Sequence, residues 1–277
     1  MITAIALLAL LIPILLAPNP APFLGFVAVA IGLAAWEWAR LNGLSGLLAF
    51  AFGFAALVLL GLIHSYVPRV PTWIWLAVFA GWALGGSLAL RHASMGWIKL
   101  SGPLRLCLGL LVLVPTGLAF LAWKALGLNA LLSALCLVWV ADVAAYFGGR
   151  RFGRRKLAPV ISPGKSWEGV WSGVLGVLLL AVLWVQFVDV QPWVDGPSLY
   201  GRLVSGLGWP LTALVLLLLA ALSVVGDLFE SLVKRAAGAK DSSQLLPGHG
   251  GILDRIDALL PVLPAALAFV ALAKVMV

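Results

Sequence analysis

Nine of the ten acidic residues lie in the C-terminal half of the chain, and seven of these are at or just beyond what we predict below to be the cytoplasmic ends of hydrophobic stretches. Two pairs, Asp227 with Glu230 and Asp254 with Asp257, are three residues apart, so each pair shares one face of a helix. Carboxylates that converge in a cavity repel one another and need a cation among them, and oxygen ligands suit Mg²⁺. The seven are Asp142, Glu168, Asp227, Glu230, Asp241, Asp254 and Asp257.

Basic residues are spread singly through the same region. Carboxylates that hold Mg²⁺, with Lys and Arg around them, form the arrangement used for phosphoryl chemistry, because the metal bridges phosphate oxygens and the cations stabilise developing charge. The glycine pairs 148–149 and 250–251 permit the backbone to approach a phosphate closely. The basic residues concerned are Lys165, Lys234, Arg235, Lys240 and Arg255.

Several of these residues also have purely structural interpretations. Glu230 and Lys234 have the spacing of an ordinary helical ion pair, and Tyr146 has the character of an interfacial anchor. His249 stands between glycines and is compatible with a structural role, and the basic run 150–156 with a topology signal or an anionic-lipid contact. A structural role is harder to assign to three carboxylates at a membrane boundary, where an unused charge costs stability. These three are Asp227, Asp254 and Asp257.

The composition indicates the medium that surrounds these groups. Of the 277 residues, 63% are hydrophobic and only 10% are charged, whereas a soluble domain carries about 25% charged residues. A bilayer explains the deficit, because a charged side chain at its centre costs about 2.5–3.5 kcal/mol. We predict one integral membrane domain over residues 1–277, in which residues 1–125 are a helical scaffold and residues 126–277 carry the catalytic helices and loops.

Apolar stretches of about 20 residues predict an all-α polytopic membrane protein with about nine transmembrane helices. The first stretch is short, but it lacks a basic leader and a cleavage site, so we interpret it as a helix and not as a signal peptide. The charged groups place an active-site cavity at the cytoplasmic ends of the last four spans. The predicted spans are 2–16, 22–40, 44–64, 71–90, 104–123, 128–148, 168–188, 209–230 and 256–276.

Charge distribution predicts the orientation. If the loops after the second, fourth, sixth and eighth spans are cytoplasmic, they hold 14 of the 18 basic residues, which predicts a cytoplasmic N-terminus and an external C-terminus. Glu37 is then expected at the interface as a partner of Arg40. Asp189 and Asp195 are expected to be solvated in an external loop.

Two other features argue against alternative classes of protein. The net charge of +8 is explained by cytoplasmic loops, and no basic face interleaved with aromatic residues points to nucleic acid. Cys107 and Cys136 lie inside apolar runs without a second Cys or a His at metal-ligand spacing, so we interpret both as small core residues.

The segment 231–257 reads SLVKRAAGAKDSSQLLPGHGGILDRID and resembles the signature of phosphatidate cytidylyltransferases, also called CDP-diacylglycerol synthases. Two further pieces resemble the same family. One is Asp142 with Tyr146 and the following Gly149-Arg150. The other is the run 162–169, SPGKSWEG, where many members carry Thr at position 166 and Ser keeps the hydroxyl. The resemblance covers residues 140–260.

The resemblance implies that phosphatidic acid and CTP react to give CDP-diacylglycerol and pyrophosphate, and that the reaction requires Mg²⁺. Whether a second cation, monovalent or divalent, takes part stays open. It also implies a homodimer in the inner (cell) membrane, with a polar cavity that opens to the cytoplasm. Asp227 and Asp254 would be metal ligands, with Asp257 as a further ligand or beside them. The expected catalytic side chains are Lys234, Arg235, Lys240, Asp241, His249 and Arg255. The expected substrate-binding side chains are Asp142, Tyr146, Ser162, Lys165, Ser166, Glu168, Glu230 and Ser231, of which Lys165, Ser166 and Glu168 would bind the nucleotide or order its loop.

Two other functions are compatible with parts of the sequence. A CTP-dependent polyprenol or phytol kinase would transfer the γ-phosphoryl group and leave no cytidine in its product. A cation-coupled transporter would use the carboxylates as ion ligands, but the charges crowd one face of the membrane and no internal repeat is evident. The D-G-x-x-A-R signature of CDP-alcohol phosphotransferases is absent.

Overall fold

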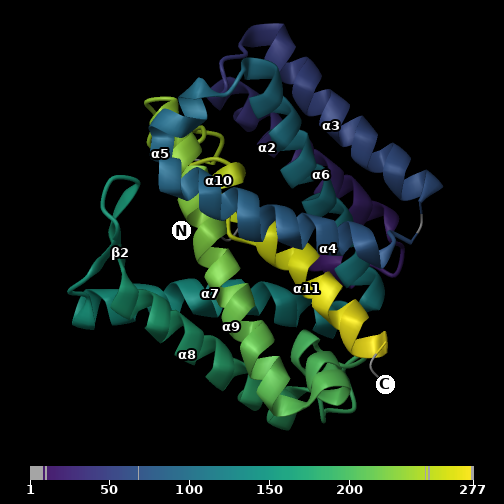
Figure 1. The fold of residues 1–277 in the computed structure, drawn as a ribbon. Helices are drawn as coiled ribbons and strands as arrows, with labels where there is room; N and C mark the ends of the chain where they lie inside the picture. Colours follow the sequence, from purple (N-terminus) through teal and green to yellow (C-terminus); the bar gives the residue numbers. More distant parts are fainter. Residues whose placement is uncertain (1–8, 10, 68, 247, 249, 276–277) are drawn as a thin grey trace.

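Long apolar runs form helices in a bilayer because each backbone N–H and C=O must find its partner within the segment. The computed structural model describes residues 9, 11–67, 69–246, 248 and 250–275, and these form a bundle of long helices with one projecting hairpin (Figure 1). In chain order the elements are α2 (Ala21–Leu41), α3 (Gly46–Tyr66), α4 (Thr72–Ala80), the π-helical turn η1 (Gly81–Gly86), α5 (Ser87–Lys99), α6 (Gly102–Leu126), α7 (Leu128–Phe152), the strands β1 (Lys156–Ala158) and β2 (Ser162–Ser166), α8 (Trp167–Leu183), the π-helical turn η2 (Trp184–Val188), α9 (Leu199–Ala236), α10 (Leu253–Ile256) and α11 (Leu259–Val275).

Among the described residues, eight helices are long and apolar enough to cross a membrane. They correspond to eight of the nine predicted spans, beginning with Ala21–Leu41 and ending with Leu253–Lys274. The first predicted span, 2–16, lies mostly outside the described residues. The protein is therefore a polytopic membrane protein built from helices, as the apolar runs predict.

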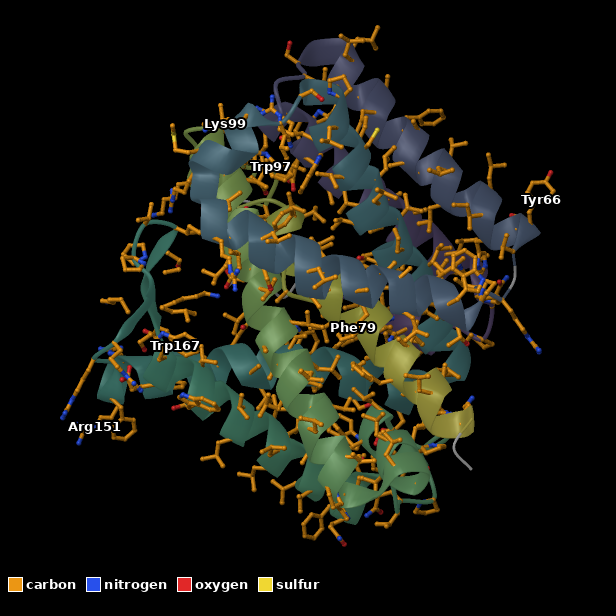
Figure 2. All side chains as sticks on the ribbon, in the orientation of Figure 1. Tyr66, Phe79, Trp97, Lys99, Arg151 and Trp167 are labelled. Atoms are coloured by element: carbon orange, nitrogen blue, oxygen red, sulfur yellow. The ribbon has the colours of Figure 1, made fainter. Side chains whose placement is uncertain are left out.

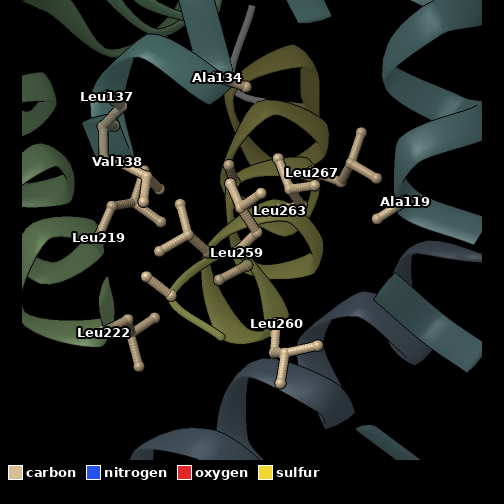
Figure 3. Close-up of a cluster of buried hydrophobic side chains, with 14 of the residues drawn as sticks. Ala119, Ala134, Leu137, Val138, Leu219, Leu222, Leu259, Leu260, Leu263 and Leu267 are labelled. Carbon is tan, nitrogen blue, oxygen red and sulfur yellow. The ribbon is translucent and has the colours of Figure 1, made fainter. Parts of the chain in front are cut away.

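The centre of the bundle is α11, whose residues 259–268 are all buried. This helix packs against α4, α6, α7 and α9. Figure 3 shows its leucines beside Leu137 of α7, Leu219 of α9 and Ala119 of α6. Because α11 follows the signature segment directly, its packing fixes where the acidic residues before it lie relative to α9.

Two side chains of α6 hold α11 at a defined depth. Pro264 lies inside α11 and has no N–H to donate to the carbonyl of Leu260 one turn earlier. The hydroxyl of Thr116 lies 3.1 Å from that carbonyl oxygen, and the indole N–H of Trp123 donates to the carbonyl of Leu263 at 3.0 Å. The carbonyl of Leu260, which the proline leaves without its helical donor, thus finds a partner inside the bundle.

The long helix α9 carries most of the predicted site and bends near its start. Gly208 has a φ of 72°, a backbone conformation that only glycine adopts without strain. Pro210 follows two residues later. The predicted span over 209–230 begins at this kink. The structure adds a helical segment before it, from Leu199, so the helix is longer than the apolar run alone indicates.

A small antiparallel hairpin interrupts the otherwise helical fold. Strands β1 and β2 pair Lys156 with Ser166 and Ala158 with Ser162, and the hairpin projects from the bundle between α7 and α8 (Figure 1). In Figure 2, Arg151 and Trp167 mark the two helix ends that flank it. The expectation of an all-α fold did not include this hairpin, which is too short and too polar to show an alternating apolar pattern.

The acidic residues of the 189–198 segment are structural, which corrects the expectation that they are merely solvated. Asp195 accepts the backbone N–H groups of Leu128 and Asn129, and so caps the start of α7. Asp189 accepts the side-chain amide of Asn129 at 2.8 Å and the hydroxyl of Ser198 at 2.7 Å. The two carboxylates therefore tie the segment to both neighbouring helices.

Candidate active site

Four charged side chains from separate parts of the chain form one group, which we call the Asp227 cluster. Its members are Asp142 of α7, Lys165 of β2, Asp227 of α9 and Asp257, which precedes α11. The ammonium nitrogen of Lys165 lies 2.5 Å from Asp227 Oδ2, and Asp257 interacts electrostatically with the other three side chains. The hydroxyl of Ser231, one turn along α9, donates to Asp227 Oδ1 at 3.4 Å. The structure thus brings together residues that the sequence placed in three separate motifs.

A second group, which we call the Asp254 cluster, adjoins the first on α9. The ammonium of Lys234 lies 2.5 Å from Asp254 Oδ1 and 2.6 Å from Glu230 Oε2. The side chains of Glu230, Asp254 and Lys234 are only 1%, 8% and 12% exposed. Glu230 receives no well-directed hydrogen bond at either oxygen, so its burial depends on Lys234. A buried carboxylate held in this way adds little net stability, which argues for a role in chemistry.

The backbone of segment 242–253, which we call the signature loop, completes the surroundings of Asp254. Its Oδ2 atom accepts the backbone N–H groups of Ser242 at 3.0 Å and Gly251 at 2.8 Å. The Ser242 hydroxyl lies 2.8 Å from the same oxygen. Asp254 is therefore fixed by both ends of the loop, and this loop is the part of the chain that carries the family signature.

Glu37 is the residue whose role the sequence led us to misassign. It was expected at the interface with Arg40, but it is fully buried and accepts hydrogen bonds from the loop that carries Ser242 and Ser243 and from the start of α10. Arg40 instead lies over the ring of Trp36, 4.8 Å from its centroid. An ionisable residue within the last turns of an apolar helix was the available signal, since such residues are functional by default.

Ser166 and Glu168, predicted to bind substrate or order the loop, order the hairpin. The Ser166 hydroxyl accepts the N–H of Gly169 at 3.2 Å and caps α8. Glu168 Oε2 accepts the backbone N–H groups of Arg154 and Arg155, both at 3.1 Å, and Oε1 pairs with the guanidinium of Arg155. These bonds hold β2 in place, and β2 carries Lys165 into the Asp227 cluster.

A polar cavity of about 740 Å³ lies between the end of α2 and the segment after α9. Lys240 and Asp241 line it, together with Arg40 and Ser45 from the N-terminal half. Ser242 lines the same cavity while it contacts Asp254. The cavity therefore connects two predicted catalytic residues with the Asp254 cluster.

Three of the remaining predicted residues make contacts outside the two clusters. Tyr146 is exposed and accepts a hydrogen bond from Arg150 at 3.3 Å, and Ser162 pairs with Ala158 in the hairpin. Arg235 donates to the carbonyl of Ala239 at 3.0 Å. Arg255 is exposed on α10, and His249 lies outside the described residues.

The two clusters hold five carboxylates and two ammonium groups, so they carry an excess of negative charge. Among the residues that the structure describes, no three His, Cys, Asp or Glu side chains form a complete metal-binding group. Mg²⁺, however, is usually held by one or two carboxylates, with waters and substrate phosphates as its other ligands. The oxygen donors of Asp227 and Asp257 fit that requirement. Asp254 would exchange its contact with Lys234 to take part.

Comparison with known proteins agrees with the signature. The chain matches the cytidylyltransferase family over residues 1–273. It is 39% identical over 268 residues to a phosphatidate cytidylyltransferase of Pseudomonas aeruginosa, with 95% of this chain and 93% of the relative covered. It is 48% identical over 138 residues to the phosphatidate cytidylyltransferase of Haemophilus influenzae, which covers 50% of this chain and 44% of that protein. The chain therefore belongs to the cytidylyltransferase family.

Proposed function

We propose that this protein is a phosphatidate cytidylyltransferase, which transfers CMP from CTP to phosphatidic acid and releases pyrophosphate. The observation that carries this proposal is the pair of adjoining clusters on α9, in which Asp227 and Asp254 each contact a lysine. The relatives that match the chain are named for the same activity. Carboxylates with ammonium groups beside them are suited to holding polyphosphate and its cation.

Little acid–base chemistry is required of the protein in this reaction. A phosphate oxygen of phosphatidic acid, already anionic at pH 7, forms the new bond to the α-phosphorus of CTP. The bond between that phosphorus and the β-phosphate oxygen breaks, and pyrophosphate leaves with its electrons. The protein therefore has to position two anions in line and neutralise their charge.

The residues of the two clusters divide this work. Lys165 and Lys234 would exchange their carboxylate contacts for phosphate oxygens when the substrates bind. Asp227 and Asp254 would hold Mg²⁺, with Asp257 beside them, and the ion would supply positive charge against the negative charge that develops on the phosphates. Lys240 in the polar cavity would contact the outer phosphates of the nucleotide.

The lipid substrate needs an apolar surface near these charges. A cavity of about 700 Å³ between α4–α5 and α6 is lined almost entirely by apolar side chains, among them Trp82 and Trp97. Its lining includes Phe229, the residue directly before Glu230. An acyl chain placed there would leave the phosphate of the lipid at the level of the Asp254 cluster.

The distribution of basic residues predicts the orientation of the protein in the membrane. We expect the two clusters at the cytoplasmic face of the inner membrane, where CTP is available, and the C-terminus outside, because the loops on the clusters' side carry most of the basic residues. Accessibility of single cysteines introduced at Gly164 and at Gly196 to a membrane-impermeant reagent tests this, because the first should be cytoplasmic and the second external. The family resemblance also implies a homodimer, which light scattering of the detergent-solubilised protein tests by its mass.

The direct test is an assay with CTP labelled in the α-phosphate, phosphatidic acid and Mg²⁺. Label in the lipid phase together with release of pyrophosphate supports the proposal. Conversion of CTP to CDP without label in lipid supports a lipid kinase instead, and untouched CTP in the presence of active lipid and metal rejects both.

The Asp227→Asn variant tests the assignment of the site. This substitution keeps the shape of the side chain and removes the charge that faces Lys165 and the cation. We expect turnover to fall by about 100-fold or more while the thermal midpoint stays close to that of the wild type. Near-normal turnover at saturating Mg²⁺ would show that Asp227 is not a metal ligand.

A further inference from the structure

Glu37 lies on α2, in the N-terminal half of the chain and far in sequence from the signature segment 231–257. Its carboxylate is fully buried and is more than 200 residues from each of its partners along the chain. Oε1 accepts the hydroxyl of Ser243 at 2.6 Å and the backbone N–H of Ile252 at 3.0 Å. Oε2 accepts the backbone N–H of Leu253 at 2.7 Å and lies 3.1 Å from the Ser242 hydroxyl.

These contacts span the whole signature loop. Ser242 and Ser243 lie at its beginning and Ile252 and Leu253 at its end, so one carboxylate closes the loop at its base. The bonds differ in their freedom, because a hydroxyl can rotate to accept a hydrogen bond, whereas a backbone N–H can only donate. Only an acceptor at both oxygens satisfies the two buried amides.

Ser242 links Glu37 to the predicted metal ligand. Its hydroxyl lies 3.1 Å from Glu37 Oε2 and 2.8 Å from Asp254 Oδ2, and it donates its single proton to one of them at a time. The backbone N–H of Gly251 donates to Asp254 at 2.8 Å, one residue before the amides that Glu37 holds. A shift of the loop at Glu37 would therefore move two of the donors that orient Asp254.

The close approach of these groups depends on Gly251. A β-carbon at this position would collide with both the Ser242 hydroxyl and Glu37 Oε1. The loop backbone at Gly251 thus lies directly against the Glu37 carboxylate.

We propose that Glu37 is a positioning residue for the reaction, which acts through the signature loop to hold Asp254 in its working orientation without touching substrate. The effect of Glu37 on turnover rests on the proposed function, whereas its effect on the loop does not. It assigns the N-terminal half a specific part in the chemistry.

The test uses Glu37→Gln in the full-length, detergent-solubilised protein. The amide group keeps the shape but places an NH₂ against Ile252 N–H or Leu253 N–H, so one buried donor loses its acceptor. We expect amide hydrogen exchange in residues 242–254 to accelerate by about tenfold or more, kcat/KM to fall by at least about tenfold, and the thermal midpoint to stay near that of the wild type. Ser243→Ala should change amide exchange and kcat/KM in the same directions but by less, because Glu37 Oε1 still accepts the N–H of Ile252.

Ser205→Ala serves as the matched control, since its exposed hydroxyl donates to the carbonyl of Arg202, far from the loop in sequence. This variant should leave exchange and turnover unchanged.

Wild-type exchange and turnover in Glu37→Gln would overturn the proposal. So would accelerated exchange across the whole bundle with turnover falling in parallel with the folded fraction, because the role would then be structural alone. If local exchange rises in a protein whose wild type forms no CDP-diacylglycerol, the proposed function fails while the anchoring of the loop stands.

Discussion

The Asp254 cluster holds side chains of opposite charge in direct contact with little exposure to solvent. Lys234 lies between Glu230 and Asp254 in a nearly solvent-free position, so the ammonium and the two carboxylates stabilise one another. Removing one partner of such a group is costly, because an uncompensated charge remains buried. The arrangement is thus sensitive to the packing of the loop above it.

Gly251 is the residue where that packing is tightest. Gly251→Ala would push a methyl group into Glu37 and Ser242, and we expect it to destabilise the protein by about 1–3 kcal/mol and to lower turnover strongly. Thermal unfolding and the CTP assay measure the two effects. Gly25→Ala is the control, because nothing lies within 4 Å of a β-carbon at that helical position. Equal behaviour of the two variants would show that the loop can move away without consequence.

Asp195 gives a pH-dependent prediction outside the membrane-spanning segments. Burial raises the pKa of its carboxyl, but hydrogen bonds from the N–H groups of Asn129 and Leu128 outweigh this, and the pKa lies below its ordinary value. A lowered pKa in the folded state stabilises the protein above the pKa of the unfolded chain, about 3.9, and the contribution is lost as pH falls through the folded value. The thermal midpoint of the wild type should exceed that of Asp195→Asn at pH 6, and the gap should close below about pH 4. A gap that persists unchanged at low pH would contradict this.

At the scale of elements, the hairpin of β1 and β2 determines where Lys165 lies. It is held at its base by Glu168, whose carboxylate binds two backbone N–H groups and one guanidinium. Arg155 is mostly exposed, with 73% of its side chain accessible, so this anchor is local and adds little to global stability.

Limited proteolysis tests that anchor. Glu168→Gln weakens the hold on the backbone of Arg154 and Arg155, and we expect trypsin to cleave within residues 150–156 several-fold faster while the thermal midpoint barely changes. Cleavage at Lys99, at the end of α5, serves as the internal control and should keep its rate. Unchanged cleavage in the hairpin segment would mean that strand pairing alone holds it.

Local periodicity explains which elements and site residues the sequence could predict. The spacing of Asp227, Glu230 and Lys234 places them on one helix face without knowledge of the rest of the fold, and eight spans follow from apolar length. Glu37 could not be assigned in this way, because its partners lie more than 200 residues away and Arg40 offered a nearer one. The hairpin was missed for a related reason, since its strands are three and five residues long.

For the molecule as a whole, the excess of carboxylates over ammonium groups in the two clusters predicts a dependence on a divalent cation. Removal of Mg²⁺ with EDTA should abolish transfer of CMP, and added Mg²⁺ should restore it, because Asp227 and Asp257 otherwise repel each other and the substrate phosphates. Binding to the folded protein alone should also raise the thermal midpoint as Mg²⁺ increases. Full activity in EDTA would contradict the prediction.

The central position of α11 has a consequence for biosynthesis. Chains are made from the N-terminus, yet the helix on which α4, α6, α7 and α9 all pack follows every one of them. The earlier helices are therefore in the membrane without their central packing partner until α11 is made, and lipid or the insertion machinery must occupy its place. Asp254 and Asp257 emerge just ahead of α11, so the candidate active site and the core are completed together. A ribosome that stalls before α11 thus releases no partly active enzyme.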